Sequence, residues 1–80
     1  MKERIRKMIE GHANLDVGLA ELGDGDDLYA AGMTSHASVN LMVALEDEFE
    51  VEFPDEMLKR EVFESVAAIE AALTQIQKGA

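Results

Sequence analysis

The pattern of apolar and polar positions predicts helices over much of the chain. Near the N-terminus, one apolar stripe has the i, i+3, i+4, i+7 spacing of a helix that ends between residues 11 and 14, and its members are Ile5, Met8, Ile9 and His12. The same spacing returns at residue 35 in a second helix, whose predicted core face consists of Ser38, Leu41, Met42, Leu45 and Phe49. The Phe53-Pro54 pair should end this helix, since the residue before a proline favours extended geometry.

Two further helices are predicted after residue 53. Pro54 and Asp55 suit the first turn of a short helix that extends to about Glu61, and Ser65 is a favourable cap for a last helix. The inward residues of the last helix are predicted to be Val66, Ile69, Leu73 and Ile76, while Ala67, Ala68, Ala71 and Ala72 permit close approach of its neighbours. The predicted fold class is all-α, a small bundle of three longer helices and one short helix.

Residues 15–34 carry four glycines and no sustained period, and they are predicted to form a long ordered loop. Apolar side chains should hold this loop on the bundle, and they are Leu15, Val17, Leu19, Leu22, Leu28 and Tyr29. The acidic run at residues 24–27 lacks the twelve-residue calcium loop with its terminal glutamate, so no metal site is assigned to it. His12 has no second histidine at metal-binding spacing and is predicted to lie at the edge of the core.

The chain has 80 residues, which is enough for one domain spanning 1–80 and too few for two hydrophobic cores. Apolar residues make up 48% and aromatic residues 5%, so the core should be aliphatic. There is no cysteine, which excludes disulfides and thiolate metal sites. No stretch has the length and hydrophobicity of a signal peptide or membrane span, so we expect a cytoplasmic monomer.

The net charge of −10 limits the partners that the protein can bind. Four of the seven basic residues precede residue 8, so the rest of the chain is strongly acidic. Nucleic acid and anionic membrane surfaces would repel it, whereas a partner with a basic surface would be attracted and steered.

The hydroxyl of Ser35 is a candidate for chemistry at the start of the second helix. Thr34 is placed to cap that helix, which leaves Ser35 as the first helical residue with its Oγ directed outward. A phosphate joined to Ser35 would be stabilised by the unpaired N–H groups and the helix dipole. In the alternative interpretation, Ser35 itself is the cap and has no other role.

The outer face of the second helix carries two valines, Val39 and Val43, among charged residues. Glu46 and Glu50 are expected on one side of them, and His36 and Asp47 on the other. Such a face suits docking of a partner with a basic rim and a shallow apolar centre. A solvated helix face with incidental aliphatic residues is the alternative.

Residues 28–56 resemble the acyl carrier proteins, whose motif is a Gly-x-Asp-Ser-Leu loop opening a helix that ends in an acidic "LEEEF" segment and an "IPDE"-like turn. Gly32 and Ser35 occupy the motif glycine and serine, and the segments "ALEDEF" and "FPDE" follow in register. "SVAAIEAAL" is similar to the last helix of the family. The resemblance implies that a transferase attaches 4′-phosphopantetheine from coenzyme A to Ser35, and that the thiol of this arm holds a cargo as a thioester.

Two positions depart from the common motif, because Thr34 replaces the aspartate and His36 replaces the leucine. A Gly-x-Thr-Ser motif is similar to that of stand-alone carriers loaded with amino acids by ligases related to seryl-tRNA synthetases. The resemblance therefore implies three partners: the transferase, a loading ligase with a basic docking surface, and a downstream acceptor enzyme. The residues expected to contact them are Thr34, His36, Val39, Val43, Glu46 and Asp47.

Other functions remain open from the sequence. The cargo of a carrier could instead be a fatty acyl, polyketide or other specialised acyl chain, which needs a cavity between the second and third helices that Met57, Leu58 and Phe63 would narrow. An unmodified acidic helical adaptor is a further possibility. Catalysis by the chain itself is not expected, because Ser35 and His36 are consecutive helical residues that do not face each other and no Gly-x-Ser-x-Gly elbow is present.

Overall fold

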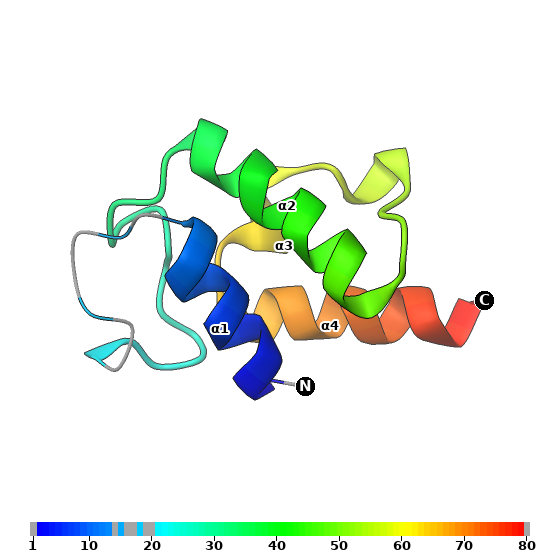
Figure 1. Cartoon of the computed structure of the whole chain (residues 1–80), viewed down its shortest axis with the longest axis horizontal. Coiled ribbons are helices and arrows are strands. Elements are labelled where there is room, and N and C mark those ends of the chain that lie inside the picture. Colours follow the sequence, from blue (N-terminus) through cyan, green and yellow to red (C-terminus); the bar gives the residue numbers. More distant parts are fainter. Residues whose placement is uncertain (1, 14, 16–17, 19–20, 80) are drawn as a thin grey trace.

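The computed structural model describes residues 2–13, 15, 18 and 21–79, and every regular element in them is helical (Figure 1). The elements are α1 (Lys2–His12), α2 (Ser35–Phe49), the 3₁₀ turn η2 (Asp55–Met57), α3 (Arg60–Phe63) and α4 (Val66–Gly79). Helix α1 contacts both α2 and α4, and α3 contacts α4. The predicted all-α class is confirmed. None of the helices in these residues is both long and apolar enough to cross a membrane.

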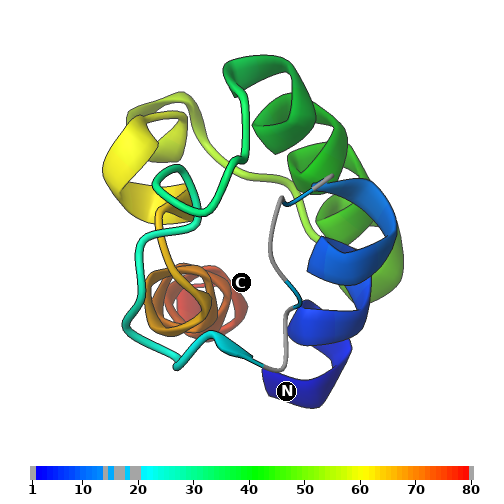
Figure 2. The ribbon, with the colours of Figure 1, turned by 90° about the vertical axis from the view of Figure 1, so that its left-hand side faces the viewer.

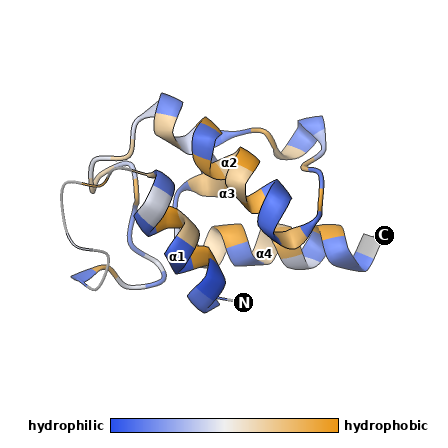
Figure 3. Cartoon of the chain, viewed as in Figure 1, coloured by the Kyte–Doolittle hydropathy of each residue, from blue (hydrophilic) through white to orange (hydrophobic). Residues whose placement is uncertain are grey.

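The core consists mainly of aliphatic side chains that the three longer helices direct toward one another. On each helix these positions alternate with hydrophilic ones at helical spacing (Figure 3). The largest fully buried side chains are Ile5, Ile9, Leu28, Leu41, Leu45, Val66, Ile69 and Leu73. Of the stripe predicted for α1, Met8 is half-buried and His12 is exposed, so only its two isoleucines reach the centre of the core.

Helix α2 is rotated slightly from the predicted orientation and is shorter than predicted. Leu41 and Leu45 are fully buried, but Ala37 joins them, whereas the predicted inward residues Ser38, Met42 and Phe49 are only half-buried. The helix ends at Phe49 instead of at the Phe53-Pro54 pair. Glu50 adopts a left-handed conformation (φ 54°), and its N–H donates to the carbonyl oxygen of Glu46. This cap, four residues before Pro54, ends the helix.

The single short helix predicted from Pro54 to about Glu61 is wrong, because the structure has two separate pieces, η2 and α3. The rings of Phe53 and Phe63 pack edge to face with centroids 5.2 Å apart. A continuous helix would separate residues ten apart by about 15 Å, so the chain between the two buried phenylalanines must fold back. Lys59 is extended at the break, and Leu58, expected to narrow the space between the second and third helices, is 47% exposed.

The last helix, α4, begins where the sequence predicted and buries most of its predicted inner face. The Oγ of Ser65 accepts a hydrogen bond from the N–H of Ala68 at 3.0 Å, as expected of a cap. Val66, Ile69 and Leu73 are buried, and Ile76 is half-buried. Of the alanines expected to permit close approach, Ala72 is buried and Ala68 half-buried, but Ala67 and Ala71 are exposed.

The described part of the segment between α1 and α2 is an ordered loop, as predicted, and it runs past the start of α4 to reach α2 (Figure 2). The N–H of Leu28 donates to the Glu64 carbonyl at 2.6 Å, and the N–H of Ala67 donates to the Asp24 carbonyl at 2.9 Å. Leu28 is buried and Tyr29 half-buried, whereas Val17 and Leu19, also expected to hold the loop, lie outside the described residues. These contacts fix the position from which α2 begins.

The acidic run at residues 24–27 is engaged in holding this loop together. The guanidinium of Arg6 donates to the Asp24 carboxylate at 2.7 Å, and this hydrogen bond lowers the pKa of Asp24. The carboxylates of Asp26 and Asp27 accept backbone N–H groups within the loop, from Gly23 and Tyr29 respectively. Because the pKa of Asp24 is lowered on folding, its ion pair stabilises the protein above the ordinary pKa of the carboxyl, and this contribution is lost as the pH falls through the lowered value. Within the described ranges, no group of three or more His, Asp or Glu side chains is arranged to hold a metal ion.

Candidate functional site

The start of α2 presents the hydroxyl of Ser35 to solvent. Thr34 has an extended backbone, and its Oγ1 accepts a hydrogen bond from the N–H of Ala37 at 3.0 Å, so Thr34 is the cap. Ser35 is the first residue of the helix and is exposed, and within the described part of the chain its Oγ makes no hydrogen bond. The alternative in which Ser35 is the cap is therefore wrong. Its oxygen is free for a covalent bond.

Backbone geometry before the cap depends on Gly32, whose φ of 114° is costly for any residue with a side chain. This conformation turns the chain out of the loop and into the extended Thr34. The N–H groups in the first turn of α2 have no acceptor in the preceding turn of the helix, and the dipole of the 15-residue helix adds positive potential there. An anionic group on the Ser35 oxygen would be stabilised by both effects.

Replacing Thr34 by Ala should remove the cap and destabilise the protein. We expect a loss of about 1 kcal/mol in the free energy of unfolding, which corresponds to a fall of roughly 4–8 °C in the melting temperature of a domain of this size. Thr34→Ser is the matched control, because its hydroxyl can still accept from Ala37. Thermal unfolding followed by circular dichroism measures both variants, and equal melting temperatures for the two would contradict the capping role.

A groove opens beside Ser35, between α2 and the segment that leads into α3. Its volume is about 340 Å³, and its lining includes Ser35, Val39, Met42 and Phe63. It lies between the elements where a carrier of acyl chains would need a cavity. Here it is open to solvent, with the half-exposed Leu58 at its edge.

Most of the residues predicted to form a docking face on α2 are exposed. Val39 and Val43 are 53% and 51% exposed, and Thr34, His36 and Asp47 are exposed as well. Glu46 differs, because it is half-buried and its carboxylate accepts a hydrogen bond from the N–H of Phe53 at 2.9 Å. Glu46 therefore closes the turn after α2. It presents less of its charge to a partner than the sequence suggested.

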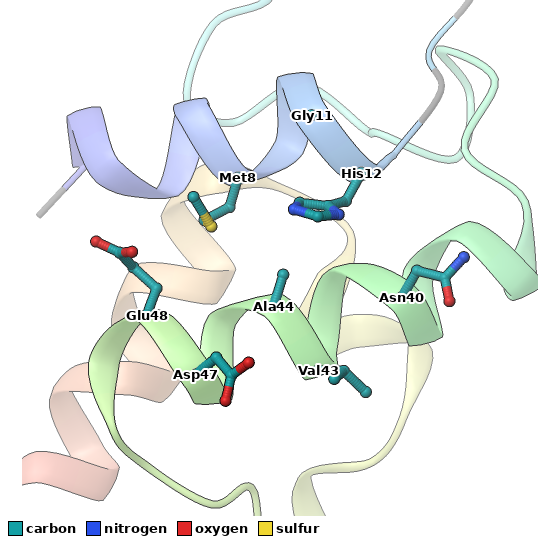
Figure 4. Close-up of a pocket in the computed structure, with 8 residues that line it drawn as sticks. All are labelled: Met8, Gly11, His12, Asn40, Val43, Ala44, Asp47 and Glu48. Atoms are coloured by element: carbon teal, nitrogen blue, oxygen red, sulfur yellow. The ribbon is translucent and has the colours of Figure 1, made fainter.

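A second groove runs between α1 and α2 and reaches the same outer face (Figure 4). Met8 and His12 from α1 and Ala44 from α2 point toward one another across it, and Val43 and Asp47 lie at its outer side. Its volume is about 660 Å³, and at Gly11 nothing lies within 4 Å of the position of an added Cβ. The exposed face of α2 thus continues into a shallow depression beside α1.

Comparison with known proteins agrees with this geometry. The family model for the phosphopantetheine attachment site matches residues 3–73. An aminoacyl carrier protein from Agrobacterium fabrum is 40% identical over 79 residues, which are 99% of this chain and 95% of that protein.

Two crystal structures with similar chains add a structural comparison. One is a complex of an engineered Bradyrhizobium japonicum glycine:[carrier protein] ligase with a carrier protein from Agrobacterium tumefaciens and AMP; the match has a TM-score of 0.90 and 40% identity over 92% of this chain and 99% of that one. The other contains the Bradyrhizobium japonicum ligase with glycylated carrier protein, at a TM-score of 0.70 and 31% identity over 89% of this chain and 96% of that one.

The chain therefore belongs to the family of phosphopantetheine-binding carrier proteins, as its resemblance to acyl carrier proteins implied. Its prosthetic group is 4′-phosphopantetheine. Within that family, one of the similar proteins is an aminoacyl carrier protein, and another is a carrier protein in its glycylated form.

Proposed function

We propose that Ser35 carries 4′-phosphopantetheine and that the protein presents an aminoacyl group, held as a thioester on this arm, to partner enzymes. One observation carries the assignment to Ser35: its oxygen is exposed at the start of α2 and has no hydrogen bond to any described residue, because Thr34 caps the helix. The residues present fit the group. The phosphate joined to the Oγ would lie at the positive end of the helix dipole.

In this function the chain holds the prosthetic group and presents the aminoacyl group, and the partner enzymes carry out the chemical steps. When bound, the prosthetic group provides the thiol that the chain, which has no cysteine, lacks. His36 follows Ser35 in the same helix and is exposed, so the two side chains do not form a nucleophile and base pair. Delivery works by local concentration, since a tethered cargo is held at an effective concentration on the order of millimolar near a docked enzyme.

An aminoacyl cargo is favoured over a long acyl chain by the form of the groove beside Ser35. A long acyl chain would need an enclosed apolar cavity to leave water, whereas this groove is open and small for a ligand site. A short polar cargo needs no enclosure. The glycylated carrier protein in one of the similar structures supports this choice. The fatty acyl, polyketide and specialised acyl alternatives are accordingly less well supported.

The partners that this function requires are a phosphopantetheinyl transferase, an amino acid ligase and an acceptor enzyme. We assign their docking to the outer face of α2, comprising Thr34, His36, Val39, Val43 and Asp47, with Glu46 contributing from its half-buried position. The two valines offer apolar contact, and Asp47 offers an exposed negative charge in a protein of net charge −10. A basic docking surface on the ligase would complement both.

Reversing the charge at Asp47 tests this docking face. We expect Asp47→Lys to slow aminoacylation by the ligase severalfold at low salt, and the difference to shrink as salt is raised, because electrostatic steering is screened. Glu3→Lys at the start of α1 is the matched control, since Glu3 is exposed and the net charge changes equally. Initial rates of thioester formation over a salt series give the answer. Equal slowing by both variants would attribute the effect to net charge and contradict a specific docking face.

Intact mass spectrometry tests the function as a whole. The purified protein is incubated with coenzyme A and a broad-specificity phosphopantetheinyl transferase, then with ATP, an amino acid ligase of the relatives' type and single amino acids. We expect one added prosthetic group and then one added aminoacyl group that hydroxylamine removes. A protein that is never modified, in the assay or in its own cells, would instead favour the unmodified adaptor. A native cargo without an amino group would identify an acyl carrier.

A further inference from the structure

The groove beside Ser35 is lined by two basic residues in addition to its apolar walls. Lys59 and Arg60 border it together with Ser35, Val39, Met42 and Phe63. The extended backbone of Lys59, at the break between η2 and α3, places the pair at this position. The attachment oxygen and two cations therefore border one groove, although they lie far apart in the sequence.

These two cations differ from Lys2, Arg4 and Arg6, and resemble the exposed Lys7 and Lys78, in forming no ion pair among the described residues. Lys2, Arg4 and Arg6 each form ion pairs with carboxylates. Lys59 and Arg60, by contrast, have no carboxylate within ion-pair distance among the residues that the structure describes. In a protein of net charge −10, such a pair is available to an anion.

Tyr29 orients one member of the pair. The guanidinium carbon of Arg60 lies 4.2 Å from the centroid of the Tyr29 ring, which is a cation–π contact. Tyr29 is itself held by the loop, since its N–H donates to the Asp27 carboxylate at 2.9 Å. A stacked guanidinium keeps its edge N–H groups free to donate, and phosphate oxygens match their geometry.

We infer that Lys59 and Arg60 bind the phosphodiester of the prosthetic group on Ser35 and hold the arm along the groove while no partner enzyme is engaged. This inference depends on the proposed attachment at Ser35. The phosphodiester supplies the anion, and the methyl and methylene groups of the pantetheine chain can cover the apolar side chains of Val39, Met42 and Phe63. Binding is intramolecular, so even a site with millimolar affinity is substantially occupied at the effective concentration of a short tether, which is on the order of millimolar.

The prosthetic arm must also leave the groove easily when a partner enzyme docks. Lys59 and Arg60 are exposed, and exposed ion pairs contribute little to stability because water and salt screen them. The groove is open to solvent, so the arm can leave without any change in the core. A partner that docks on the outer face of α2 would therefore meet an arm that is protected in solution and available on contact.

The experiment compares the apo-protein with the enzymatically prepared holo-protein by NMR. If the arm lies along the groove, attachment of the prosthetic group changes the chemical shifts of Tyr29, Leu58 and Phe63 as well as those of residues next to Ser35. The double variant Lys59→Gln/Arg60→Gln should lose the changes at Tyr29, Leu58 and Phe63. In the unaltered protein, 1 M salt should reduce the same changes, because the Debye length at this salt concentration is about 3 Å. The thiol of the double variant should react with a neutral maleimide about two- to fivefold faster.

The control is Lys7→Gln/Lys78→Gln, which removes the same two charges from exposed positions on α1 and α4. It should leave both the chemical shifts and the thiol rate of the holo-protein unchanged. The inference is overturned if attachment changes shifts only beside Ser35, or if both double variants alter the thiol rate equally. It is also overturned if Lys59→Gln/Arg60→Gln slows charging by the ligase while the holo-protein shifts stay as they were, since the pair would then bind a partner. Absence of any attachment at Ser35 would be read from the mass, and would refute the proposed function instead.

Discussion

Ser35→Ala should abolish attachment of phosphopantetheine, and with it all aminoacyl loading, while leaving the protein folded. The fold should survive because Ser35 is exposed and its Oγ makes no hydrogen bond within the described residues, so we expect stability to change by less than about 0.5 kcal/mol. The loss of function should be complete, since the alanine side chain has no oxygen to which the group can be joined. Intact mass after incubation with coenzyme A and the transferase measures attachment, and circular dichroism measures folding.

Ser38→Ala is the matched control for this experiment. Ser38 lines the same groove as Ser35 and lies one turn further along the helix, where its Oγ donates to the carbonyl oxygen of Ser35 at 2.7 Å. The variant keeps the attachment oxygen and should be fully modified. Attachment to Ser35→Ala at any residue would refute the assignment, and so would a Ser38→Ala protein that is folded but remains unmodified.

The largest effect on stability is expected from Leu41→Ala. Leu41 is fully buried on the inner face of α2, where it belongs to the core shared with α1 and α4. Truncating a buried leucine removes apolar contacts and leaves a cavity, at a cost of about 2–5 kcal/mol. A domain of this length has a total stability of only about 4–12 kcal/mol, so a large fraction of the variant should be unfolded under mild urea. The shift of the urea midpoint, at unchanged slope, gives the loss.

Val43→Ala provides the comparison on the same helix. Val43 is 51% exposed on the outer face, so its truncation removes little buried area and should change stability by less than about 0.5 kcal/mol. The same variant should still weaken docking if the outer face binds partners. A similar destabilisation by Leu41→Ala and Val43→Ala would contradict the division of α2 into a core face and a docking face.

The sequence predicted those parts of the site that depend on local physics. The Thr34 cap, the start of α2 at Ser35 and the exposure of Val39 and Val43 all depend on interactions within one or two helical turns. The Ser65 cap is of the same kind. Each of these predictions could be made because the partner atoms are a few residues apart, where the helical period fixes their relation.

Two features of the site region were not predictable in this way. Glu46 was expected on the docking face, but its carboxylate accepts the N–H of Phe53, which reaches it only because the chain turns back after the left-handed Glu50. The segment after Pro54 was expected to be one helix, but the packing of Phe53 on Phe63 divides it. In the first case a side chain–backbone hydrogen bond withdraws a charge from the surface, and in the second an aromatic contact outweighs local helix propensity.

By itself, the sequence determined that this is an acidic bundle of helices with a serine hydroxyl exposed at the start of the second one. Periodicity and capping suffice for that, because they act between near neighbours. Only the tertiary structure decided what surrounds the hydroxyl: Tyr29 from the loop, and Lys59 and Arg60 from the interrupted segment, line the groove with Ser35. The physical reason is that burial of Leu28, Phe53 and Phe63 in one core sets where those distant segments lie, and no local pattern encodes that position.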